Sequence, residues 1–253
     1  MRSSGRASRA VSLQPKALRR VARCWLAVFA FCCLAAQSPA GPWPRDQGAV
    51  FLSVEAGLDR AAGQDRAALR LYGEYGLTDA ITLGAKLERE GRWSLDGQVG
   101  AMRNLRDART GMTAFVRLHP AVLPAEFPIG VELQASPDTL LPSDRARLAV
   151  HLGHGFVLRE RAGWARLSLS GGVSGRRTEG TQDLLVQAGL RVSPKLRVWI
   201  SGDITRDPFS TTRRGTASAA LDVNVRHAIT FGLSRVPGAS GETGVRLGSW
   251  HQF

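Results

Sequence analysis

The chain has 253 residues, of which 43% are hydrophobic and 22% charged, and a formal net charge of +13. A β-barrel or β-sandwich of this length is commonly one domain. Residues 1–40 contain seven basic residues and no acidic residue, and removing these seven charges leaves about +6 for residues 41–253. Because more than half of the charge lies in this leader, the remaining composition gives no reason to expect a nucleic-acid partner.

The leader has the features of a secretory signal peptide. A basic region ends at Arg23, an apolar run covers residues 24–36, and the small residues Ser38 and Ala40 follow. The apolar run is too short to cross a bilayer comfortably as a helix. We therefore expect cleavage after Ala40, which leaves residues 41–253 as the mature domain; a retained N-terminal anchor is the alternative.

All three cysteines, Cys24, Cys32 and Cys33, lie in the leader. The predicted mature chain therefore has no disulfide, no thiolate nucleophile and no cysteine-ligated metal. We expect neither a metal site nor a cofactor. No stretch after Ala40 is apolar for close to twenty residues, which excludes helical membrane spans.

Apolar and polar residues alternate along most of the mature chain. Ile81, Leu83 and Leu87 fall in one phase, for example, whereas Lys86 and Glu88 fall in the other. Such alternation places the two sets on opposite faces of a β-strand. Thirteen runs of this kind begin near Val50, Leu69, Ile81, Trp93, Met112, Phe127, Ala146, Leu167, Leu184, Leu196, Ala217, Ile229 and Val245.

The length of the runs and the near absence of charge in their apolar phase indicate membrane-spanning strands. A charge that faces lipid at mid-depth costs roughly 2–4 kcal/mol. About ten residues of tilted strand rise about 25 Å, which matches the apolar band of an outer-membrane barrel, whereas strands in soluble proteins average about 5–6 residues. The sequence therefore predicts an all-β protein, an antiparallel transmembrane β-barrel of a Gram-negative outer membrane. A soluble β-sandwich is the alternative.

The number of strands follows from parity. Single-chain bacterial barrels have an even number of strands, so one of the thirteen runs must be misread, split or peripheral. The least secure runs are the first, near Val50, and the short one from Ile229. We predict twelve strands, with ten and fourteen as alternatives.

Aromatic residues stand at or near the ends of several runs. Outer-membrane barrels place aromatic girdles at the two membrane interfaces. The sequence therefore predicts interfacial positions for Tyr75, Trp93, Phe127, Trp164 and Phe253.

The sequence resembles a broad group of porin-like and uncharacterised bacterial outer-membrane β-barrel proteins. The resemblance rests on residues 74–84, EYGLTDAITLG, which look like the strand–turn–strand segments of such barrels, and on Phe253. A final Phe on an alternating strand looks like the signal that the barrel assembly machinery reads. The resemblance implies this machinery and outer-membrane lipid as partners. Arginines in the connections can bind lipopolysaccharide phosphates, so lipopolysaccharide is a further expected partner. The resemblance defines no catalytic or ligand residue, and the oligomeric state is left unknown.

The polar phase of the runs is expected to line the lumen. One interpretation is a ladder of paired charges that fills a small barrel; the other is a channel whose arginines favour anions. The candidate lumen-lining residues are Arg70, Glu74, Lys86, Glu88, Asp96, Arg117, Glu132, Arg147, Arg166, Arg191, Arg197, Asp203, Asp222 and Arg226.

Three functions remain open. A passive porin-like channel for small polar solutes is the main hypothesis, and a structural or accessory barrel of an envelope or polysaccharide-export assembly is the second. The third is a lipid-modifying enzyme, for which Ser168 or Ser170 would need His151 or His119 as a base. No recognisable signature surrounds these residues, so we expect no catalytic activity. His151 and His154 are three residues apart, which places them on opposite faces of a strand.

Overall fold

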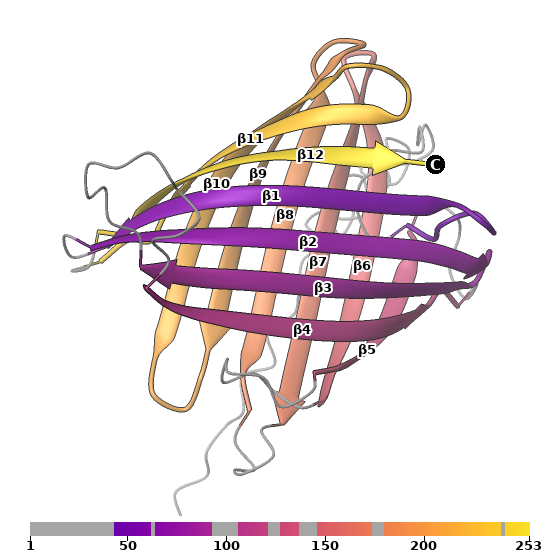
Figure 1. Ribbon diagram of the computed structural model, residues 1–253. Helices are drawn as coiled ribbons and strands as arrows, with labels where there is room; N and C mark the ends of the chain where they lie inside the picture. Colours follow the sequence, from indigo (N-terminus) through magenta and orange to yellow (C-terminus); the bar gives the residue numbers. More distant parts are fainter. Residues whose placement is uncertain are drawn as a thin grey trace, which may run out of the picture.

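The computed structural model describes residues 43–61, 64–92, 106–120, 127–136, 146–173, 180–238 and 241–253. The leader lies outside these ranges, so its cleavage after Ala40 stays a prediction. Twelve strands form one closed antiparallel barrel (Figure 1). They are β1 (Val50–Ala61), β2 (Gln64–Thr78), β3 (Ile81–Arg92), β4 (Arg106–Leu118), β5 (Ile129–Ala135), β6 (Ala146–Leu158), β7 (Arg161–Val173), β8 (Gln182–Arg191), β9 (Leu196–Arg206), β10 (Thr211–Asp222), β11 (His227–Arg235) and β12 (Thr243–Gln252).

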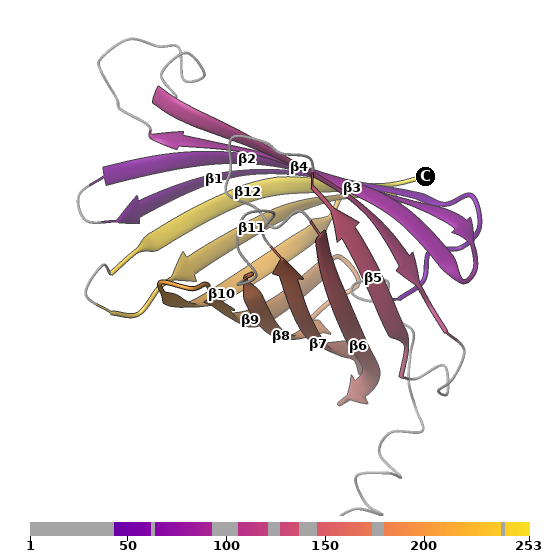
Figure 2. The same cartoon turned by 90° about the horizontal axis from the view of Figure 1, so that it is seen from below.

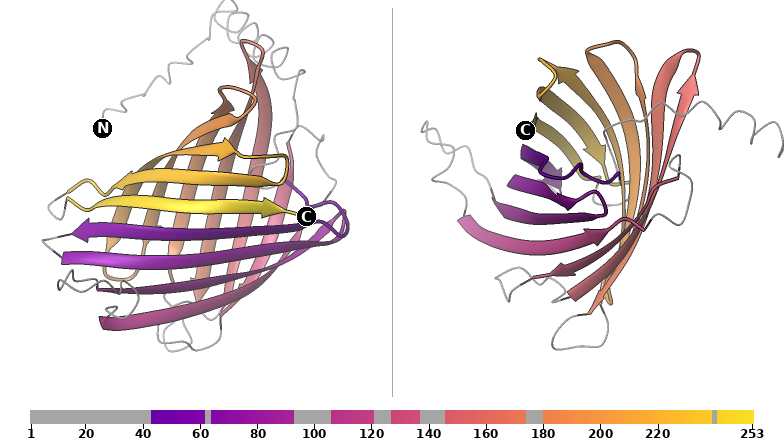
Figure 3. Two further views of the ribbon diagram at one scale, coloured as in Figure 1. Left: turned by 45° about the horizontal axis from the view of Figure 1, so that its top comes forward. Right: turned by 90° about the vertical axis from the view of Figure 1, so that its right-hand side faces the viewer.

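Each strand pairs with its neighbours in the chain, and β1 pairs with β12 to close the sheet (Figure 3). At this seam Val50 N donates to Phe253 O over 3.1 Å, and Phe253 N donates to Val50 O over 2.9 Å. Closure satisfies the backbone groups that an open sheet would leave unpaired at its edges. The C-terminal residue is therefore part of the seam.

The prediction of twelve antiparallel strands is confirmed. The runs near Val50 and Ile229, the least secure in the sequence, are the regular strands β1 and β11. The thirteenth run, near Trp93, falls on residues 93–105, which lie outside the described ranges. No helix in the described part of the chain is long and apolar enough to span a membrane.

The apolar phase of the strands points out of the barrel. Leu133, Ile200 and Leu247 expose 61%, 66% and 58% of their surface, whereas polar residues such as Thr82 and Glu132 are buried in the interior. An exposed apolar band of this extent fits a lipid environment, because lipid solvates aliphatic side chains and cannot satisfy polar ones. β1–β4 and β12 form one wall, β6–β10 form the other, and the interior lies between them (Figures 1 and 2).

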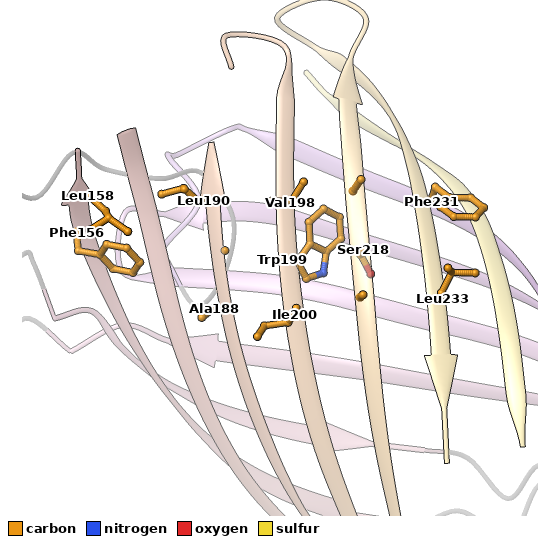
Figure 4. A pocket seen from close by; sticks show the side chains of 13 residues that line it. Phe156, Leu158, Ala188, Leu190, Val198, Trp199, Ile200, Ser218, Phe231 and Leu233 are labelled. Atoms are coloured by element: carbon orange, nitrogen blue, oxygen red, sulfur yellow. The ribbon is translucent and has the colours of Figure 1, made fainter. Parts of the chain in front are cut away.

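A shallow groove with a volume of about 560 Å³ lies on the outer surface over β6–β11 (Figure 4). Its lining includes the small residues Ala188, Ala217 and Ala219 and larger side chains such as Leu190 and Phe231. Most of its lining belongs to the outward phase. The groove is therefore a recess in the apolar surface rather than part of the lumen.

The two ends of the barrel differ. Val50, Phe253 and the connections β2–β3, β4–β5, β6–β7, β8–β9 and β10–β11 lie at one end, called here the terminus end; the other is called the loop end. All of these connections except β4–β5 are short. Arg159 and Glu160 have φ values of 48° and 67°, as a two-residue type I′ hairpin requires. In outer-membrane barrels the short turns face the periplasm and the longer loops face outward.

Candidate functional site: the lumenal charge cluster and aromatic belt

Strand register places twelve of the fourteen predicted lumen-lining residues on the inner face. Among these, Glu74, Arg117, Glu132 and Arg197 are buried. Asp96 lies outside the described residues. Arg226 does not lie on a strand: it is an exposed residue of the β10–β11 turn, because β10 ends at Asp222, four residues earlier than the alternation suggested.

The centre of the inner face is an ion-pair network that joins β2, β4 and β5. Arg117 is 3% exposed and lies between two carboxylates. Its Nη1 donates to Glu74 Oε1 over 2.7 Å, and its Nε and Nη2 donate to Glu132 Oε2 over 2.8 and 2.5 Å. Arg117 on β4 thus links Glu74 on β2 to Glu132 on β5, and both carboxylates are buried with it.

Glu132 collects further donors from the neighbouring strands. Gln134 Nε2 donates to its Oε1 over 2.6 Å, and Lys86 Nζ lies 3.5 Å from the same oxygen. His151 Nε2 lies 3.4 Å from Oε2. Glu74 is similarly surrounded, since Tyr72 Oη also donates to it. The two buried carboxylates therefore have their lone pairs engaged by protein donors, as buried charges require.

A segment outside the barrel strands completes the network. Arg45, which precedes β1, donates from Nε to Glu74 Oε2 over 2.5 Å. Its backbone passes over the inner side of Gly76, where a Cβ would lie only 2.1 Å from Asp46 O. Gly48 N and Gly76 N form backbone hydrogen bonds that fix this segment to the end of β2. Glycine at position 76 is thus what allows the pre-strand segment to enter the mouth of the lumen.

Arg166 differs from the other arginines of this region. Its Nε donates to Ser168 Oγ over 2.8 Å, and its Nη2 lies 3.3 Å from His151 Nδ1. Within the described residues it has no carboxylate partner. We define the charge cluster as Arg45, Glu74, Lys86, Arg117, Glu132 and Arg166; its four cations and two carboxylates give it a net charge of +2 with the histidines neutral.

Ser168 and His151, two residues of the enzyme hypothesis, are in contact. Ser168 Oγ lies 2.9 Å from His151 Nδ1, with Glu132 behind the ring. Arg166 approaches both Ser168 Oγ and His151 Nδ1, so it competes for the lone pair that a general base would use. Both residues face the lumen, on the opposite side of the wall from the apolar surface, and this arrangement favours a structural network over a lipid hydrolase.

The other two residues of that hypothesis lie elsewhere. His119 Nε2 is 3.4 Å from Thr82 Oγ1. Ser170 donates to Asp183, which also accepts from Arg147. His154 points outward, as the strand period predicted, and stacks on Phe127 with ring centres 4.6 Å apart.

Aromatic rings form a second feature of the inner face, called here the aromatic belt. It comprises Trp199, Trp250, Phe51, Tyr72 and Phe115, and successive ring centres are 5.3, 6.2, 6.2 and 5.8 Å apart. Trp199 reaches Trp250 across β10 and β11, whose inner face carries buried small residues at Ala220 and Ala228. The belt therefore runs around the lumen from β9 to β4.

Cations of the lumen lie over this belt. Arg197 Cζ is 5.0 Å from the Trp250 ring centre and Arg45 Cζ is 4.5 Å from that of Phe51. Lys86 Nζ and Arg117 Cζ are each 5.2 Å from the Phe115 ring centre. Cation–π attraction offsets part of the cost of holding these charges inside the barrel.

The sequence predicted neither the belt nor Arg45. Phe51, Tyr72, Phe115 and Trp250 stand in the polar phase of their runs, which is the one signal that could have revealed them. Trp164 is a correction: it is 2% exposed and lies inside the barrel over Gly189, so it is not a girdle residue. Tyr75, Phe127 and Phe253 are exposed at the terminus end; Trp93 lies outside the described residues.

The rest of the inner face carries ion pairs in smaller groups. Arg70 bridges Glu55 and Glu88, with N–O distances of 3.1 and 2.6 Å, and Arg197 pairs with Asp222. No group of three or more His, Cys, Asp or Glu side chains within the described ranges could hold a metal ion.

A closed twelve-stranded barrel with an apolar exterior and a charged interior has the fold of the outer-membrane β-barrels. Among solved structures it is similar to an outer-membrane channel from Pseudomonas putida F1, with 15% identity over 86% of this chain and 100% of that chain, and a TM-score of 0.51. It is also similar to the KdgM porin (9% identity, 79% and 99% coverage, TM-score 0.54) and the NanC porin (6%, 78% and 98%, TM-score 0.52).

These identities establish a shared fold and nothing finer. No protein-family model matches the sequence, and no curated protein matches it significantly. The function must therefore be argued from the lumen itself.

Proposed function

We propose that the protein is a passive, porin-like channel of the Gram-negative outer membrane for small polar solutes. The observation that carries this proposal is the inner face, where charged and hydrogen-bonding side chains line a closed barrel whose outer face is apolar. The similarity of the fold to channels and porins supports it. Insertion by the barrel assembly machinery, with Phe253 as the signal, and contact with lipopolysaccharide belong to the same proposal.

The charge cluster favours anions over cations among these solutes. Its carboxylates are occupied by protein donors, whereas Arg166 has only neutral partners, so the cluster offers uncompensated positive charge to the lumen. Fixed charges of one sign along a pore raise the local concentration of the opposite ion.

Planar-bilayer recording with the purified full-length protein tests the channel directly. We expect stepwise conductance in KCl and, under a KCl gradient, a reversal potential on the anion-selective side. A barrel that inserts and shows no conductance would contradict the proposal and favour the structural or accessory barrel, which the dense ion-pair network also suits.

Arg166→Gln is expected to reduce anion selectivity while leaving the channel able to insert and conduct. The variant removes one of four cluster cations but no carboxylate partner, so the cluster net charge falls from +2 to +1. The measurement is the shift of the reversal potential toward zero. Arg213→Gln, an exposed residue on the outward phase of β10, is the matched control and should leave the potential unchanged.

A further inference from the structure

The terminus end of the lumen contains a cavity whose lining shares no residue with the charge cluster. It has a volume of about 460 Å³ and lies beneath the β8–β9 and β10–β11 turns. Its walls are largely apolar, with Trp250, Ala228 and Pro194 among them. We call this cavity the basic vestibule, because its charged lining residues are Arg191, Lys195, Arg197, Arg226 and Asp222.

The vestibule has too little negative charge for its arginines. Arg191 and Arg197 stand directly opposite each other on β8 and β9, and like charges in that position destabilise a strand pair. They share one carboxylate: Asp222 Oδ1 accepts from Arg197 Nη2, and Asp222 Oδ2 lies 3.6 Å from Arg191 Nη1. Arg197 is 6% exposed, and its Nε has no hydrogen-bond partner within the described structure.

The two remaining cations strengthen the imbalance. Lys195 and Arg226 lie in the turns that frame the vestibule, and within the described residues neither has a carboxylate at ion-pair distance. Asp222 is the single acidic side chain among the lining residues. Four cations thus face one carboxylate in a cavity with mostly apolar walls, the combination of apolar surface and few polar groups that ligand pockets show.

We infer that the basic vestibule binds an organic anion, with its carboxylate or phosphate between Arg191 and the turn cations and its apolar part against Trp250. Such an anion would relieve the repulsion between the two opposed arginines and add charge-assisted hydrogen bonds. An apolar ring or chain would remain in contact with the indole and the aliphatic walls. The site does not require conduction, so it stands or falls separately from the channel proposal.

Equilibrium binding to the full-length protein in zwitterionic detergent tests this inference, with benzoate as the probe and titration calorimetry as the readout. We expect benzoate to bind, acetate to bind more weakly and neutral benzamide not to bind, because both the charge and the ring are used. Arg191→Gln is expected to weaken benzoate binding about tenfold, the effect of losing one charge-assisted hydrogen bond. Arg213→Gln, which removes an equal charge at the loop end, should bind as the unmodified protein does.

The source of the anion is distinguished by a second arm. Dihexanoyl phosphatidylglycerol is added in competition with benzoate, and the corresponding phosphatidylcholine is the control. If phosphatidylglycerol displaces benzoate and phosphatidylcholine does not, the site exists and takes a lipid headgroup. Binding of phosphatidylglycerol in the absence of any benzoate binding would lead to the same assignment. Binding of benzoate that the lipid does not displace would support a soluble solute.

Two results would overturn the inference. One is that neither benzoate nor dihexanoyl phosphatidylglycerol binds, and the other is that benzoate binds equally well to Arg191→Gln. If Arg191→Gln does not show the heat-modifiable gel mobility of a folded barrel, Lys195→Gln replaces it in the binding test. Lys195 lies in the β8–β9 turn, outside the sheet, so this substitution does not alter a strand. Absence of conductance alongside anion binding would remove the channel proposal and leave this site in place.

Discussion

Replacing Glu132 by glutamine is expected to lower the free energy of unfolding by about 3–5 kcal/mol, the usual effect of removing one partner of a buried ion pair. Glu132 is 1% exposed and accepts two hydrogen bonds from Arg117, which is itself 3% exposed. The neutral amide keeps the shape of the side chain but leaves Arg117 with Glu74 as its one carboxylate. Urea unfolding in lipid vesicles, followed by tryptophan fluorescence, measures the change.

Glu160→Gln is the matched control for Glu132→Gln. Glu160 is exposed in the two-residue β6–β7 turn, where loss of one charge should change the unfolding free energy by less than about 0.5 kcal/mol. Equal effects of the two substitutions would show that the lumen is hydrated enough to solvate Arg117, and the buried network would then contribute little to stability.

Gly84→Ala is expected to lower the free energy of unfolding by about 1–3 kcal/mol, the range for overpacking a filled site. An added Cβ would lie 2.1 Å from Phe115 Cζ and 2.7 Å from the backbone oxygen of Gly73. Phe115 is 4% exposed and stacked on Tyr72, so its ring has little room to move. The same unfolding measurement applies.

A double-mutant cycle identifies the cause of the Gly84 effect. In a Phe115→Ala background the ring is absent, so Gly84→Ala should cost less than it does in the unmodified protein. Gly202→Ala is the control, since nothing lies within 4 Å of a Cβ at that position. An undiminished cost in the Phe115→Ala background would assign the strain to the Gly73 backbone instead of the ring.

The sequence predicted the barrel because the lipid-facing surface imposes one simple rule on every strand. Outward positions at the depth of the lipid chains must be apolar, and this requirement produced a period of two that is visible without knowledge of the partners of any residue. The number of strands followed from the thirteen alternating runs together with the even parity of such barrels. The position of β1 could be read in the same way, although its polar phase includes Phe51, an aromatic residue that belongs to the interior.

The lumen follows no comparable rule. Phase placed Arg117, Glu132 and Glu74 on the inner face, but it could not show that they bond to one another, because contact depends on strand register and side-chain reach. Arg45 lies outside every alternating run, and its place in the cluster depends on the backbone hydrogen bonds and the close approach between its segment and Gly76. Trp164 and Trp250 show the same limit: an aromatic ring near a strand end fits a membrane interface or a lumen equally well in sequence.

The seam between β1 and β12 has a kinetic consequence. Val50 and Phe253 stand at the two ends of the described barrel, so their hydrogen bonds close the largest loop in the protein, and pairing over such separations makes folding slow. Until that step, both edge strands expose unpaired backbone groups that can pair with other chains. The contact between Phe51 and Trp250 also crosses this seam. The aromatic belt is therefore continuous only when β1 and β12 are paired, and we expect Trp250 fluorescence to change when this pair forms.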